Sequence, residues 1–187
     1  MADAEMKSSW KADIIIGVSA FLISMATFFV LIYQTQLWQE QNQLARKQQY
    51  ASVLPYLEIW YNHPNSKNFT LVVGNNGVGP AFIKSVSIHY KGTIFQGDPE
   101  QFLSKVLNAE GDTIQHFSFS RVNPGRVLPA GQEIHLLNIE NDLKSAQKLK
   151  EVFGENIAAL DIIYESVYEE TWQTKGLGNP PIKLTVK

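Results

Sequence analysis

The side chains best suited to proton transfer or metal binding are four histidines, and their spacing matches no known site. His89, His116 and His135 fall in three separate predicted strands, and His63 falls in a turn. A folded sheet can bring two strand histidines together, but no His-x-His or HExxH spacing predicts it. The chain has no cysteine, which excludes disulfides, thiol nucleophiles and cysteine-ligated metals. We therefore interpret the histidines as scattered strand residues and predict neither a metal nor a cofactor.

The other reactive side chains lack the surroundings that catalysis needs. No serine lies in a GxSxG turn, and the serines of the predicted strands simply alternate along them. Glu165, Glu169 and Glu170 surround a predicted hairpin, where three carboxylates could hold a cation or a basic partner. A solvated turn accounts for them as well, and we prefer that interpretation. The sequence therefore predicts no catalytic residue.

A glycine-rich stretch over residues 74–79 (GNNGVG) invites comparison with phosphate-binding loops. Such loops lead into a helix and usually carry a lysine. Here Pro80 and a strand-like run follow instead. We interpret Asn76, Gly77, Gly79 and Pro80 as a structural loop that turns the chain between two strands.

The charge balance excludes one class of partner. The chain has 187 residues, with 16 Lys and Arg against 18 Asp and Glu and a formal net charge of -2. Nucleic-acid binders need clustered basic residues to displace counterions from phosphates. Because the basic residues are scattered, we expect no nucleic acid partner.

Residues 14–33 contain neither charge nor proline and predict a transmembrane helix. Twenty residues at about 1.5 Å each span the roughly 30 Å hydrocarbon core. A cleaved signal peptide is the alternative, but its apolar region is shorter and ends at a small-x-small site that is missing here. We expect a tail over residues 1–13 and one retained span. Two basic residues lie near each end, so the positive-inside rule leaves the orientation open.

A glutamine-rich stretch over residues 34–53 predicts a helical stalk that continues the membrane helix until Pro55 stops it. An apolar stripe recurs every seven residues along both parts, and in the stalk it comprises Leu37, Leu44 and Ala51. A row of small residues lies beside it in the membrane: Gly17, Ala20, Ser24 and Thr27. Such rows let membrane helices approach closely. We predict self-association or docking on another membrane protein, although an apolar helix contains such a stripe by chance too.

Residues 54–175 predict a mainly β domain, an antiparallel Ig-like β-sandwich with two short helices on its connections. The strands are expected at residues 54–61, 69–73, 81–90, 113–122, 132–139, 157–164 and 171–174. Asp98 is expected to cap the first helix, and the second helix is expected at residues 142–153. Residues 176–187 predict an extended tail or edge strand. The expected core aromatics are Trp60, Phe69, Phe82, Phe117, Phe119, Tyr164 and Trp172.

Three pieces of the sequence together resemble a group of bacterial single-pass membrane proteins. The first is the short N-terminal tail with the membrane helix and the glutamine-rich helix. The second is SVLPYLEI at residues 52–59 with NGVGPAFI at residues 76–83, and the third is IYESVYEETW at residues 163–172. The group opens its domain with a PYL strand and carries an NxGxGPA loop. The resemblance implies a bacterial inner-membrane protein and no particular activity.

Three functional hypotheses follow. The first is a non-catalytic accessory or interaction subunit that sits in the bilayer and binds a membrane protein partner. The second is a homo-oligomeric effector or sensor whose transmembrane helices assemble and whose β-domain senses a ligand. The third and weakest is an enzyme built from the strand histidines.

Overall fold

The computed structural model of the chain describes residues 2–63, 65–108, 111, 114, 117–155 and 157–185, with only the backbone for residues 2–13. The chain folds into two compact units, residues 1–49 and residues 50–187.

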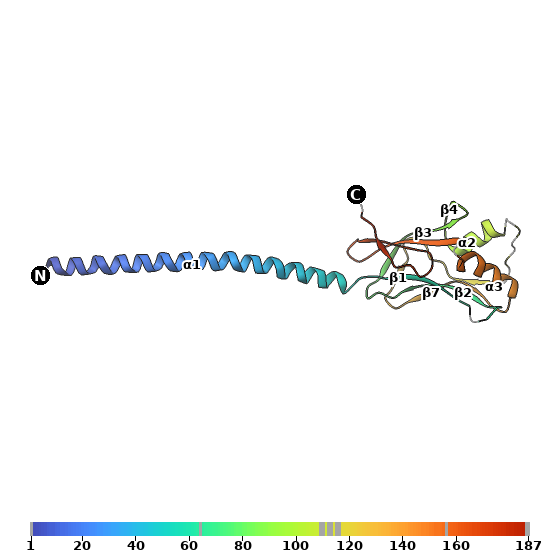
Figure 1. Cartoon of the computed structure of the whole chain (residues 1–187), viewed down its shortest axis with the longest axis horizontal. Helices are drawn as coiled ribbons and strands as arrows, with labels where there is room; N and C mark the ends of the chain where they lie inside the picture. The colour runs from blue at the N-terminus through green and yellow to red at the C-terminus, as the bar shows by residue number, and fades with distance from the viewer. Residues whose placement is uncertain are drawn as a thin grey trace. The chain divides into compact units, whose positions relative to one another are not determined.

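A single unbroken helix, α1 (Ala2–Ala51), forms the N-terminal unit and ends just inside the second (Figure 1). It contains the predicted tail, which is therefore helical, the predicted membrane span and most of the predicted stalk. No proline interrupts it, and it ends before Pro55, whose ring disfavours helical backbone in the preceding residue. By length and composition, this helix can span a membrane or serve as a signal sequence.

The second unit contains two antiparallel sheets. Within the described residues, the first sheet has the strand order β1 (Leu57–Asn62), β2 (Phe69–Asn75), β7 (Glu133–Ile139), β5 (Phe117–Phe119). The second has the order β10 (Ile182–Lys183), β9 (Thr171–Lys175), β8 (Ala158–Glu165), β3 (Ala81–Tyr90), β4 (Thr93–Gln96), with β6 (Val127–Leu128) also on β3. The mainly β prediction is confirmed, and two antiparallel sheets are consistent with a β-sandwich.

Strand β4 was not predicted, and its turn explains why. It pairs with β3 through a two-residue connection, Lys91 and Gly92, with φ of 47° and 79°. Positive φ at both positions suits the twist of a tight hairpin, but a lysine at the first position is a weak sequence signal for it. Of the strand expected at residues 113–122, the structure contains β5; Ile114 and residues 120–122 are described but are not in a strand, and residues 113, 115 and 116 lie outside the described part.

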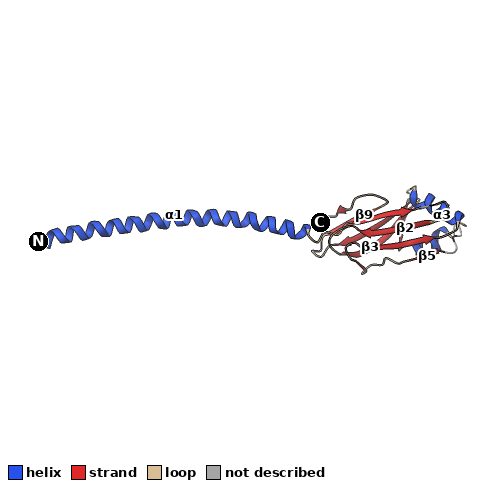
Figure 2. Cartoon of the chain, turned by 90° about the horizontal axis from the view of Figure 1, so that it is seen from below, coloured by secondary structure: helices blue, strands red, loops and turns tan. Residues whose placement is uncertain are grey.

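Two short helices close one end of the sheets (Figure 2). Helix α2 (Pro99–Phe102) continues into the π-helical turn η1 (Leu103–Leu107), and α3 (Leu143–Leu149) continues into η2 (Lys150–Gly154). The predicted cap is confirmed, since Asp98 accepts from the backbone N–H of Gln101. Asp142, expected as the first residue of the second helix, is its N-cap instead and accepts from the backbone N–H of Ser145. Since Phe102 and Phe153 are fully buried, these helices complete the core rather than decorate connections.

The core between the sheets is more aliphatic than the sequence suggested. Of the expected aromatic residues, Phe69 and Tyr164 are fully buried, whereas Phe119 is 43% exposed. Trp60, Phe82, Phe117 and Trp172 are partly buried. The prediction for Phe119 is wrong because β5 is an edge strand that pairs only with β7, and the ring instead contacts the guanidinium of Arg121.

Candidate functional site

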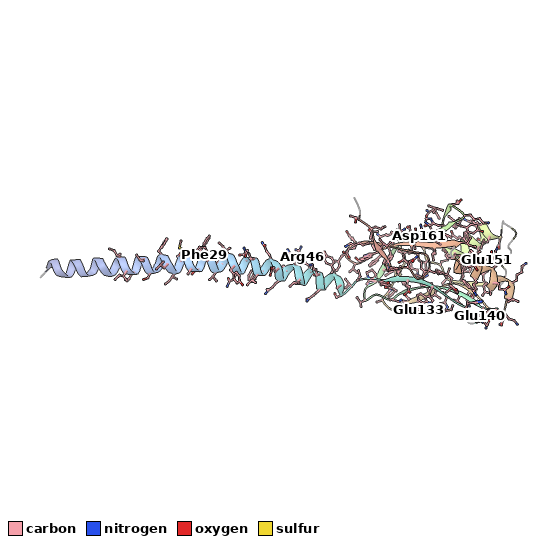
Figure 3. All side chains as sticks on the ribbon, in the orientation of Figure 1. Phe29, Arg46, Glu133, Glu140, Glu151 and Asp161 are labelled. Carbon is pink, nitrogen blue, oxygen red and sulfur yellow. The ribbon has the colours of Figure 1, made fainter. Side chains whose placement is uncertain are left out.

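The predicted membrane-packing residues, Gly17, Ala20, Ser24 and Thr27, are all exposed on α1. Their spacing of three and four residues places them on one helix face. Thr27 donates its hydroxyl to the carbonyl of Ile23 at 2.8 Å, so this polar group is satisfied within the helix. The surrounding side chains of the apolar stretch are exposed as well, and Figure 3 shows them projecting on all sides, Phe29 among them. An apolar surface of this kind requires lipid or another helix to cover it.

The predicted stalk residues, Leu37, Leu44 and Ala51, are also exposed. Seven-residue spacing keeps them near one face of the helix. Trp38, which is 71% exposed, is a further large apolar side chain beside them. The stalk thus presents apolar groups within a sequence that is otherwise rich in glutamine.

A short linker, residues 52–56, joins α1 to β1 and is held by the glycine loop, residues 76–80 between β2 and β3. The carbonyl of Leu54 accepts from the N–H groups of Val78 and Gly79 at 3.0 and 3.3 Å. The carbonyl of Tyr56 accepts from the N–H of Asn76 at 2.8 Å. These bonds fix the chain that leaves the helix before it enters the first sheet.

The glycines of this loop are required by the closeness of the linker. A methyl group on Gly79 would lie 1.8 Å from the carbonyl oxygen of Val53. One on Gly77 would lie 2.4 Å from the carbonyl oxygen of Leu54. The interpretation of Asn76, Gly77, Gly79 and Pro80 as a structural loop therefore acquires a specific reason: two backbone segments meet where no side chain fits.

Asn75, which the sequence analysis passed over, is the central residue of this arrangement. It is completely buried. Its side-chain amide donates to the carbonyls of Gly79 and Leu128 at 2.8 and 2.9 Å, and its carbonyl accepts from the N–H groups of Tyr56 and Gly77 at 3.1 Å. Asparagine supplies two donors and an acceptor with two lone pairs, so one side chain satisfies four backbone groups, two in buried and two in partly buried hydrogen bonds. The side chain of its neighbour Asn76 donates instead to Glu58, at the surface.

The residue after the linker, Leu57, connects the two sheets. It belongs to β1 of the first sheet, but its N–H donates to the hydroxyl of Tyr164 at 3.3 Å. Its carbonyl accepts from the hydroxyl of Thr174 at 2.8 Å. Tyr164 and Thr174 lie on β8 and β9 of the second sheet, and both are fully buried. The start of the domain is therefore bonded to both layers.

Tyr164 makes this contact sensitive to alkaline pH. Burial raises the pKa of its phenol above the usual value of about 10, although its hydrogen bonds with Leu57 and Thr174 act in the opposite direction. The folded state thus holds this proton more tightly than the unfolded chain. Its contribution to stability is complete below about pH 10 and is lost as pH rises toward the folded pKa, by at most about 1.4 kcal/mol per pH unit.

We expect Tyr164→Phe to lower the free energy of unfolding by about 1 kcal/mol at neutral pH, through the lost hydrogen bonds. Because the variant lacks the titrating group, the difference between the two proteins should shrink above pH 10. Urea denaturation of the detergent-solubilised chain at several pH values between neutral and strongly alkaline measures it. A difference that stays constant across this range would contradict the assignment.

A polar row lies on the face of the second sheet that points away from the core. Asp161, between the buried Leu160 and Ile162, is itself buried and accepts from Gln173 Nε2 with both oxygens, at 2.9 and 2.8 Å. His89 Nε2 lies 3.1 Å from the same carboxylate. Because these contacts satisfy the carboxylate, the row can orient a polar ligand but contains no free nucleophile.

A pocket of about 460 Å³ adjoins this row and shares Gln173 with it. Its other lining residues include Lys175, Asn179, Pro180 and Ile182. The walls are mainly apolar, with the ammonium of Lys175 as the charged group. Lys175 Nζ lies 3.4 Å from His89 Nδ1, which links the pocket to the polar row.

The three described histidines, His63, His89 and His135, do not form a cluster. His89 lies on β3 in the second sheet, whereas His135 lies on β7 in the first. His63 contacts the carbonyl of Asn68 at 2.6 Å, and His116 is outside the described residues. Across the part of the chain that the structure describes, no group of three or more His, Asp or Glu residues could hold a metal ion.

The acidic residues around the last hairpin are engaged with lysines. Glu165 pairs with Lys84 at 2.7 Å, and Glu170 pairs with Lys183 at 2.6 Å. Glu169 lies between them in the turn with a φ of 60°. The predicted solvated turn is thus a turn with two surface ion pairs, a kind of pair that contributes little to stability.

Comparison with known proteins identifies the chain at the level of a family. No curated protein and no solved structure is significantly similar to it. A family model described as a domain of unknown function, DUF8453, matches residues 14–176. This match includes the apolar helix, the linker, the glycine loop and both sheets as far as β9. The chain therefore belongs to the DUF8453 family.

Proposed function

We propose that the protein is a non-catalytic, single-pass subunit of the bacterial inner membrane, whose Ig-like β-domain or transmembrane helix binds a membrane protein partner. The observation that carries the proposal is the exposed, uncharged surface of residues 14–33 on a helix that leads into a domain without an assembled catalytic centre among its described residues. The resemblance to bacterial single-pass proteins with PYL and NxGxGPA motifs supports the same assignment.

The linker supports an anchoring role. A domain that only needed a tether would tolerate a flexible connection, as glycine- and serine-rich linkers provide. Here the chain after α1 is hydrogen-bonded to the rest of the domain at Leu54, Tyr56 and Leu57, within six residues of the helix end at Ala51. Within the same unit, the ring of Tyr50 makes an edge-on contact with Tyr168, with centroids 4.6 Å apart. We infer that movement of the helix end is transmitted to the sheets rather than absorbed.

Purification from native membranes in several mild detergents, followed by mass spectrometry, tests the proposed role. We expect one membrane protein to co-purify at a fixed ratio. A triple variant with leucine at Gly17, Ala20 and Ser24 then shows which surface binds the partner. A partner bound through the small-residue row should be lost from this variant, whereas a partner bound through the β-domain should still co-purify. Recovery of the chain alone under every condition would contradict the subunit role.

The second candidate is a homo-oligomer. It is favoured by the small-residue row and by the exposed Leu37 and Leu44, which together could form a helix–helix seam. In that case a second copy covers the apolar stripe, and the β-domain serves as a sensor or effector.

Cysteine crosslinking separates the two candidates. Because the natural chain has no cysteine, single variants are free of background. If the chain self-associates, Leu37→Cys and Leu44→Cys should form disulfide dimers several-fold faster in membranes than Gln39→Cys and Arg46→Cys, which lie on the opposite helix face. Equal rates at all four positions would exclude a seam on this stripe.

A further inference from the structure

A second pocket, of about 210 Å³, lies beside the N-cap of α2, and the capping residue Asp98 is part of its lining. Ser85 of β3 and Gln96 of β4 line it, together with Asp98, Gln101 and residues 122–124. These residues offer hydroxyl, amide and carboxylate oxygens on one side and the apolar groups of valine and proline on the other. The lining contains no lysine, arginine or histidine.

Asp98 is the only charged residue in this lining, and only one of its two carboxylate oxygens accepts a hydrogen bond within the described structure. Its side chain is buried, with the residue 2% exposed. Oδ1 accepts from the N–H of Gln101 at 3.0 Å, but Oδ2 is buried and has no hydrogen-bond partner within the described structure. Nor does Asp98 form an ion pair with any described residue. A buried carboxylate oxygen without a donor is unfavourable, so it marks a position where an external donor would be stabilising.

The cap of the other helix shows what is missing. Asp142 caps α3 in the same way, but its second oxygen accepts from the hydroxyl of Ser145 at 2.6 Å. The corresponding residue in α2 is Gln101. Its side chain lies over Gly97, where an added methyl group would be only 2.5 Å from Gln101 Oε1. The residue that completes the cap of α3 is thus replaced in α2 by one that leaves Asp98 Oδ2 without a donor from any described residue.

We propose that this pocket binds a small organic ammonium, of the class of protonated primary amines. Its N–H groups would donate to Asp98 Oδ2 and to the neighbouring amide or hydroxyl oxygens, while its aliphatic part packs against Val86, Val122 and Pro124. A divalent metal is disfavoured because it needs several carboxylates or carbonyls in a fixed shell, and Asp98 is the only carboxylate present. Since Oδ2 is covered in the unliganded structure, binding moves at least one side chain of the wall.

Titration of the full chain in detergent micelles with ethanolamine hydrochloride tests the proposal. We expect saturable binding with a Kd on the order of 1 mM, as suits a ligand of a few heavy atoms with one charge-assisted contact. Shifts in the NMR signals of the Gly97 and Gln101 amides should report it. The neutral 1-propanol should not produce them. Absence of saturable ethanolamine binding, or tighter binding of calcium at the same amides, would overturn the proposal.

Two variants test the role of Asp98. Asp98→Asn keeps the shape and a good helix cap but removes the charge, and it should weaken ethanolamine binding at least about tenfold. The matched change Asp142→Asn should leave binding unchanged. A second variant, Asn123→Leu, is used if Asp98→Asn folds poorly. Asn123 is exposed, so leucine should be tolerated there; it should narrow the pocket and also weaken ethanolamine binding. If Asp98→Asn or Asn123→Leu folds and binds ethanolamine as tightly as the natural chain, the ammonium site is wrong. This result would not bear on the proposed membrane role.

Discussion

Replacing Asn75 with alanine should lower the free energy of unfolding of the β-domain by about 3–5 kcal/mol, among the largest effects available to a single change. The side chain bonds to four backbone groups: the carbonyls of Gly79 and Leu128 in buried hydrogen bonds, and the N–H groups of Tyr56 and Gly77 in partly buried ones. Each unsatisfied buried group costs about 1–3 kcal/mol, and partial access of water reduces the sum. Against a total stability of about 5–15 kcal/mol, this loss is substantial.

Asn76→Ala is the matched control. The two asparagines are adjacent, but Asn76 makes one side-chain bond, to Glu58 at the surface, so its loss should cost less than about 1 kcal/mol. Urea denaturation followed by tryptophan fluorescence measures both variants in the same detergent. Similar losses for the two changes would show that Asn75 is not the residue that holds the loop.

Gly79→Ala should release the linker from the domain. The added methyl group would lie 1.8 Å from Val53 O and 2.3 Å from Val53 C, so the linker must shift by more than 1 Å. That movement breaks the bonds from Val78 and Gly79 to Leu54. We expect a loss of about 3 kcal/mol or more in the free energy that keeps the linker closed, which makes its opening about 100-fold more frequent.

Limited chymotrypsin digestion detects this opening through the rate of cleavage after Tyr56. Gly154→Ala is the control, since its methyl group would meet the nearest atoms at an ordinary 3.4 Å. Gly154→Ala should be cleaved at the natural rate. If Gly79→Ala is cleaved no faster than this control, the linker is not closed by the loop.

The helix and most strands were predictable from the sequence because their signals are local. The uncharged run of residues 14–33 and the helix formers after it predict one long helix, and α1 has it. Strand β3 occupies the predicted residues, and the predicted Asp98 cap acts through a backbone group only three residues away. The tight turn at Lys91 and the exposure of Phe119 were missed, since one depends on an atypical turn residue and the other on a position at a sheet edge.

The candidate sites were predictable only in part. The glycine loop was recognised as structural, but its spacing cannot show that the linker backbone lies against Gly77 and Gly79. Asn75 looks like any loop asparagine beside Asn76, and only burial distinguishes them. Asp98 and Asp142 also look alike in sequence, because each precedes a short helix. Only the structure shows that Asp142 Oδ2 has a donor and that Asp98 Oδ2 has none among the described residues.

By itself, the sequence determined where the chain is apolar, where it is helical and which residues cap or turn it, because these properties depend on neighbours within a few positions. Tertiary structure decided which polar groups are buried and paired. Asn75 meets Leu128, and Leu57 meets Tyr164 and Thr174, across separations of 53, 107 and 117 residues. Hydrogen bonds of that range arise from the packing of two sheets, and no local pattern encodes them.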